Sequence, residues 1–182
     1  MIDLGGVTGD GEFDTLEIGG IGLSVVEGSY PEDSDFAGQK YYSLKSFGAS
    51  SKIGEAANAI GNNAEASGES ASALGRNVAA TGDHSTAIGL NATASGESAI
   101  AMGFNVEATG LASQAFGDFA KAKNTNANAI GSWTLAEGPD STALGYHAKA
   151  TGTSSYAIGG YAEASETDAY AIGNRAINPA LI

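Results

Sequence analysis

Small and apolar residues recur along this chain with a period of 14 residues. The triplet alanine–apolar–glycine occurs nine times, from Ala59-Ile60-Gly61 to Ala171-Ile172-Gly173, and no copy is displaced by even one residue. A second glycine closes the other half of most units, so each unit contains two turn signals and two segments of strand length. A helix is disfavoured because each interior glycine would cost roughly 1 kcal/mol. The pattern therefore predicts stacked coils of two short parallel strands, from about residue 49 to residue 178.

Alternation along each strand indicates which side chains point inward. Four positions of the repeat hold small or medium residues in almost every copy, as Ala99, Ala101, Val106 and Ala108 do in one coil. We expect these residues to fill a thin lumen.

The residue after the alanine of each triplet has the opposite parity, so we expect a large apolar row on the outside. The row consists of Ile60, Leu74, Ile88, Met102, Phe116, Ile130, Leu144, Ile158 and Ile172. A continuous exposed apolar stripe marks an interface, and burying each such side chain contributes roughly 1.5–3 kcal/mol. The row therefore predicts homo-oligomerisation, in a closed ring that brings one stripe per subunit to a common axis.

The repeat, written Ser/Ala-x-Ala-Ile-Gly-x-x-Ala-x-Ala-x-Gly, resembles the head repeats of YadA-like trimeric autotransporter adhesins. The similarity covers about residues 49–178 and is clearest over residues 98–110 and 155–164. It implies an all-β fold: a left-handed parallel β-roll with 14-residue coils. It also implies a tight homotrimer with the apolar row at the trimer interface.

The surroundings of the repeat differ from those in the adhesins, which carry a secretion signal, a coiled-coil stalk and a membrane anchor. This sequence has no basic N-terminal region, no heptad pattern and no apolar run of membrane length. Similar rolls occur in bacteriophage fibres, where an N-terminal segment fastens to the particle. We therefore expect a trimeric virion fibre or appendage that touches a host surface. The alternative is the head fragment of an adhesin on a bacterial cell surface.

The first 48 residues lie outside the repeat. Residues 13–18 and 21–26 have the composition of two strands joined by Gly19-Gly20, residues 28–38 that of a loop, and residues 41–44 that of a further strand. This segment is expected either to attach the protein to a larger assembly or to cap the first coil. Residues 179–182 form a short tail.

Composition narrows the function classes. A formal net charge of −13 disfavours nucleic acid and anionic membranes as partners. The chain has no cysteine, and its two histidines, His84 and His147, occupy different repeat positions with no triad spacing around either. We expect no enzymatic activity, no cofactor and no metal site. An ice-binding surface is also disfavoured, because the row Ser67, Thr81, Ser95 and Thr109 is interrupted by Lys123 and Glu137.

One repeat position changes character along the chain. It holds asparagine in the first four coils (Asn63, Asn77, Asn91 and Asn105), which suits a left-handed turn and a hydrogen-bonded ladder. It then holds Phe119, Trp133, His147 and Tyr161. These four residues, the aromatic strip, are a candidate receptor site for a host protein or glycan. The alternative is a ladder that only stiffens the roll or contacts a second protomer.

Overall fold

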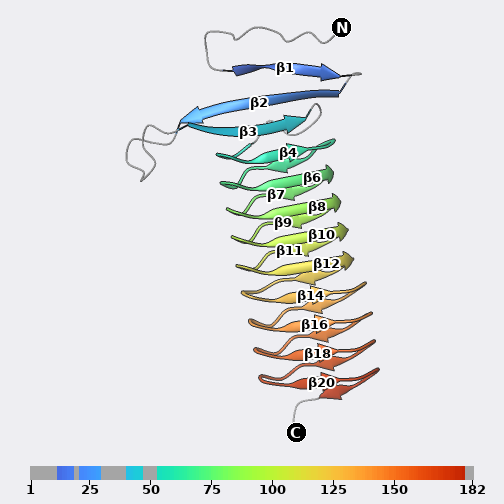
Figure 1. Cartoon of the computed structure of the whole chain (residues 1–182). Helices are drawn as coiled ribbons and strands as arrows, with labels where there is room; N and C mark the ends of the chain where they lie inside the picture. Colours follow the sequence, from blue (N-terminus) through green and yellow to red (C-terminus); the bar gives the residue numbers. More distant parts are fainter. Residues whose placement is uncertain (1–11, 19–20, 30–39, 47–52, 179–182) are drawn as a thin grey trace.

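The computed structural model describes residues 12–18, 21–29, 40–46 and 53–178, and the regular elements in this part of the chain are all strands. They form two sheets that face each other along a rod, seen in Figure 1 as a column of stacked coils. The strands of the larger sheet are, in order, β1 (Glu12–Ile18), β2 (Ile21–Ser29), β3 (Lys40–Ser46), β4 (Asn58–Ile60), β6 (Ser72–Arg76), β8 (Thr86–Leu90), β10 (Ile100–Phe104), β12 (Gln114–Asp118), β14 (Asn128–Ile130), β16 (Thr142–Leu144), β18 (Tyr156–Ile158) and β20 (Tyr170–Ile172). Those of the smaller sheet are β5 (Glu65–Ala66), β7 (Ala79–Ala80), β9 (Thr93–Ala94), β11 (Glu107–Ala108), β13 (Lys121–Ala122), β15 (Leu135–Ala136), β17 (Lys149–Ala150), β19 (Glu163–Ala164) and β21 (Ile177–Asn178).

Every strand of the roll pairs in parallel with the strand one coil away, and paired residues are 14 apart. Ala101 of β10 lies opposite Ala115 of β12, and Ala108 of β11 lies opposite Ala122 of β13. The constant shift follows from the uninterrupted period of the sequence, because one extra residue would turn the inward side chains outward. The predicted parallel β-roll with 14-residue coils is confirmed.

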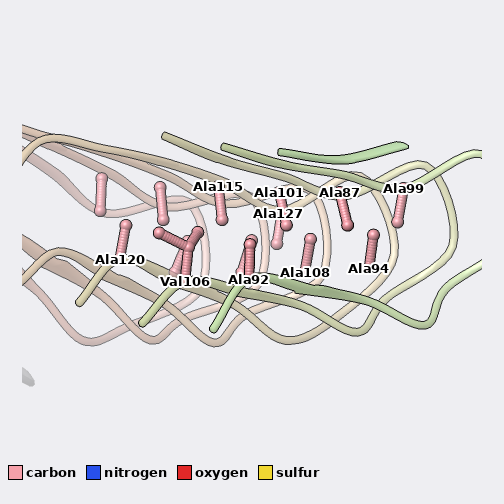
Figure 2. Packing of buried hydrophobic residues seen from close by; sticks show 14 of the residues in the cluster. Ala87, Ala92, Ala94, Ala99, Ala101, Val106, Ala108, Ala115, Ala120 and Ala127 are labelled. Atoms are coloured by element: carbon pink, nitrogen blue, oxygen red, sulfur yellow. The ribbon is translucent and has the colours of Figure 1, made fainter. Parts of the chain in front are cut away.

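The space between the two sheets is filled mainly by alanine (Figure 2). Ala101, Ala108 and their equivalents are fully buried, and Val78, Val106 and Thr134 are the largest fully buried side chains. Such a thin lumen accepts no larger residue without strain, because protein interiors are close-packed. The small rows predicted to point inward therefore form the core.

Each coil turns at residues with left-handed backbone. In the first four coils one such position holds the asparagine row, with φ of 53° at Asn63 and 54° at Asn91. The side-chain amide of Asn77 donates to the Oδ1 of Asn91 at 3.2 Å, and that of Asn91 to the Oδ1 of Asn105 at 2.9 Å. The expected asparagine ladder is confirmed.

The N-terminal strands extend the larger sheet of the roll. β1 and β2 are antiparallel, β2 and β3 are antiparallel, and β3 pairs in parallel with β4. The three predicted strands are thus present, but β2 reaches Ser29, so Gly28 lies in a strand and not in the expected loop. The turn at residues 19–20, the rest of that loop, the predicted start of the roll at residues 49–52 and the tail at residues 179–182 lie outside the described residues. Because these strands cover the first edge of the larger sheet, their arrangement suits a cap.

Candidate functional site

The large apolar row lies on the outside of the roll, as its parity predicts. Leu74, Ile130 and Leu144 are 47%, 38% and 41% exposed, and Ile88, Phe116 and Ile158 are half-buried. In the parallel register each member lies beside the next, as Met102 lies beside Phe116. The result is an apolar ridge along the rod, and its role in a trimer interface stays a prediction.

The aromatic strip follows each triplet glycine by two residues, and its rings stack face to face along the rod. The ring centroids of Phe119 and Trp133 are 4.1 Å apart, those of Trp133 and His147 5.8 Å, and those of His147 and Tyr161 5.2 Å. The interplanar angles are 10°, 4° and 2°. The structure therefore brings all four predicted residues together in one stack.

Both ends of this stack are covered. The ring of Phe104 meets Phe119 edge-on, with centroids 5.3 Å apart, and the guanidinium carbon of Arg175 lies 5.8 Å from the ring centre of Tyr161. Trp133 and Tyr161 are nevertheless 49% and 48% exposed. Since the ring faces are covered, a partner would meet the edges of these rings, and not the flat faces on which sugars and apolar groups commonly stack.

The backbone of the strip favours asparagine over the residues present. Phe119, Trp133 and Tyr161 have φ of 57°, 59° and 58°, a conformation that costs bulky side chains roughly 1–2 kcal/mol each. A stacked aromatic pair stabilises the fold by only about 0.5–1.5 kcal/mol. The two effects nearly cancel, so stability alone does not account for aromatic residues where asparagine fits. The same left-handed φ recurs at this turn in every coil, so the fold sets the backbone and only the aromatic side chains distinguish the strip.

A small pocket opens beside the strip in the seventh and eighth coils. It has a volume of about 220 Å³ and is lined by His147, Lys149, Tyr161, Ala162 and Glu163. Nearby, the electrostatic influence of Tyr161 is the main cause that raises the pKa of the Tyr146 hydroxyl, followed by desolvation and by a hydrogen bond to Tyr161. Tyr146 therefore stays uncharged at neutral pH, and Lys149 and Glu163 contribute one positive and one negative charge to the pocket.

Sequence reasoning did not single out Phe104, Lys149 or Glu163. Phe104 belongs to the repeat position just before the strip, which varies from coil to coil, and lysine and glutamate are ordinary at exposed strand positions. In the described part of the chain, no three histidine, aspartate or glutamate side chains are placed to hold a metal ion. No helix there is long and apolar enough to cross a bilayer.

The family model of the YadA head domain repeat (2 copies) matches residues 53–77, 80–105, 122–148, 136–162 and 150–176, which together make up more than half of the chain. Among solved structures, the chain is similar to the crystal structure of the collagen-binding domain of the Yersinia adhesin YadA. The two are 28% identical, the match covers 69% of this chain and 62% of that one, and the TM-score is 0.41. This chain thus matches less than two thirds of the length of that domain. A comparison with curated proteins finds no match.

Proposed function

Because this chain belongs to the family of YadA head-domain repeats, we propose that it is a homotrimeric adhesive rod that projects from a virion as a fibre or appendage. Heads of this family are non-enzymatic adhesins exposed at a surface, so adhesion outside the cell is the general function. To this general function the proposal adds the trimeric state, the attachment to a virion and the residues that contact the host.

The observation that carries the proposal is the outward apolar ridge from Ile60 to Ile172. The lumen of each coil is already filled, so these large side chains have no place inside their own chain. An uninterrupted apolar ridge in water favours association, and closed symmetry lets each copy use the same ridge. Three copies around one axis would bury it, as in the trimeric adhesins that the repeat resembles.

A virion fibre is supported by the order of the segments. The strands β1 to β3 precede the roll and continue its larger sheet, which places a non-repeat element at one end of the rod. We propose that residues 1–48 fasten this end to the particle and that the C-terminal coils point outward. The alternative is an adhesin head on a bacterial surface. Immunogold labelling of purified particles and of intact cells distinguishes the two: label on particles supports the fibre, and label on the cell envelope alone supports the adhesin.

The aromatic strip is the proposed contact with a host surface protein or glycan. Its support is that Trp133 and Tyr161 are half-exposed, and that ring stacking stabilises the strip by no more than the left-handed backbone costs it. Binding of the trimeric protein to host cells tests this role. Collagen, the ligand named for the Yersinia domain, can be included among immobilised host proteins.

The informative variant is the double substitution Trp133→Asn and Tyr161→Asn, which restores the asparagine found earlier in the same row. We expect it to fold, to stay trimeric and to lose at least about tenfold in cell binding. The matched control is Tyr156→Asn with Tyr170→Asn, which removes another stacked pair, 5.1 Å between centroids, from a different row. Unchanged binding by the folded strip variant would reject the receptor role.

A further inference from the structure

We infer that the pocket beside the aromatic strip binds an uncharged sugar residue of a glycan, with Lys149 and Glu163 as the hydroxyl-binding groups. This inference rests on the proposed adhesive function and names the ligand class at one end of the strip.

The size of the pocket suits a single ring-sized group. Its volume of about 220 Å³ lies below the roughly 300–1,000 Å³ of pockets that hold drug-sized ligands. It opens on the surface between two neighbouring coils, with Ala162 as a buried floor residue and His147 and Tyr161 beside it. One sugar of a longer chain can therefore enter while the rest lies along the rod.

Lys149 and Glu163 face each other in register but do not form an ion pair. Lys149 of β17 lies opposite Glu163 of β19, and both are exposed. Two coils earlier, at the same repeat position, Lys121 reaches Glu107 with 2.8 Å between Nζ and Oε1. Lys123 and Glu137 also pair across neighbouring coils. Among the described residues, the cation and the carboxylate of the pocket thus keep their hydrogen-bonding capacity.

An ammonium and a carboxylate side by side are complementary to sugar hydroxyls in their hydrogen-bond donors and acceptors. The ammonium has three donors and the carboxylate only acceptors, while each hydroxyl can both donate and accept. Two adjacent hydroxyls can therefore satisfy both groups with charge-assisted hydrogen bonds. The opposite charges of Lys149 and Glu163 cancel, so this couple offers no net attraction to an ion.

The rest of the surface argues against an acidic glycan. The chain carries a formal net charge of −13, which repels anionic polymers at long range. Because the ring faces of the strip are covered, Trp133 and Tyr161 offer their edges as a wall along the path of the chain. An uncharged glycan held by the pocket and lying along these edges fits both observations.

The test is binding of the full-length protein to immobilised neutral oligosaccharides, built from hexoses and N-acetylhexosamines, and to their sulfated and uronic counterparts. We expect binding to at least one neutral member, with little change between low and high salt because no net charge is paired. Lys149→Met with Glu163→Gln should weaken this binding by at least about tenfold. The matched control is Lys121→Met with Glu107→Gln, which removes the paired lysine and glutamate and should leave binding unchanged.

Three results would overturn the inference: binding to no member, binding only to acidic members with steep salt dependence, or neutral binding that survives in the pocket variant. Both altered side chains are exposed, so we expect that variant to keep the wild-type melting temperature. Glu163→Gln alone provides a milder second test of the same contact. The strip variant is Trp133→Asn with Tyr161→Asn, and the pocket variant is Lys149→Met with Glu163→Gln. If host-cell binding is lost in the first but kept in the second, the adhesive function is supported and the sugar site is rejected.

Discussion

The carbonyl oxygen of Gly117 lies 1.9 Å from the position that a Cβ atom on Gly103 would occupy. The same close approach recurs along the roll, and Gly103 also has a φ of 139°. The triplet glycine is therefore required twice, once by the backbone of its own coil and once by the next coil.

Gly103→Ala should destabilise the roll strongly. The left-handed backbone alone costs of order 1–3 kcal/mol, and the clash with the next coil adds to it. Thermal unfolding followed by circular dichroism measures the effect. The matched control is Gly160→Ala, because a Cβ there meets no atom closer than 3.3 Å. Equal melting temperatures for the two variants would contradict the close-approach argument.

Four serine hydroxyls point into the lumen without a hydrogen-bond partner among the described residues: those of Ser85, Ser113, Ser141 and Ser155. A buried hydroxyl left unpaired costs about 1–3 kcal/mol. Ser113→Ala, which places the residue found at Ala99 and Ala127, should therefore keep or raise the free energy of unfolding. Ala99→Ser should lower it. Chemical denaturation of both variants checks the sign, and a destabilised Ser113→Ala would show that the hydroxyl is used.

The strip variant Trp133→Asn with Tyr161→Asn should change the melting temperature by only a few degrees. It loses three stacked contacts, worth about 0.5–1.5 kcal/mol each, and relieves two strained residues, worth roughly 1–2 kcal/mol each. Differential scanning calorimetry of the wild-type and variant proteins gives the comparison. A large drop would instead favour a stiffening ladder over a receptor site.

Removal of residues 1–40 should leave a trimeric roll, because most of β3 remains to pair with β4. The shortened protein should no longer assemble onto its particle, which pull-down with particles lacking this protein measures. Retained assembly would reverse the proposed polarity. Aggregation of the shortened protein, seen by size-exclusion chromatography, would instead assign the segment to capping the sheet.

The period and the parity of the repeat were enough to predict the fold, the inward alanine rows and the outward position of Ile130 and its equivalents. They also placed Trp133 beside His147, since residues 14 apart must be neighbours in such a roll. They could not predict that the ring faces are covered, because this depends on side-chain rotamers and on Phe104, which belongs to another repeat position. Nor could they predict that Lys121 and Glu107 form an ion pair while Lys149 and Glu163 do not. All four residues occupy the same repeat position, and only the side-chain rotamers decide which lysine reaches its glutamate.

Ile130→Asp tests whether the apolar ridge is buried between subunits, because Ile130 lies in the middle part of the ridge. It would place three carboxylates near the proposed axis, at a cost of several kcal/mol per trimer for unpaired buried charge. The matched control is Ser95→Asp. It adds the same charge at an exposed residue that directly follows strand β9 of the smaller sheet. We expect Ile130→Asp to dissociate or misfold and Ser95→Asp to stay trimeric.

Sedimentation equilibrium of the wild-type chain at micromolar concentration tests the central claim most directly, because the proposed trimeric rod requires that the apolar ridge be buried between subunits. The account predicts a single species with three times the 18.0 kDa mass of the chain. A stable, folded monomer at that concentration would contradict it.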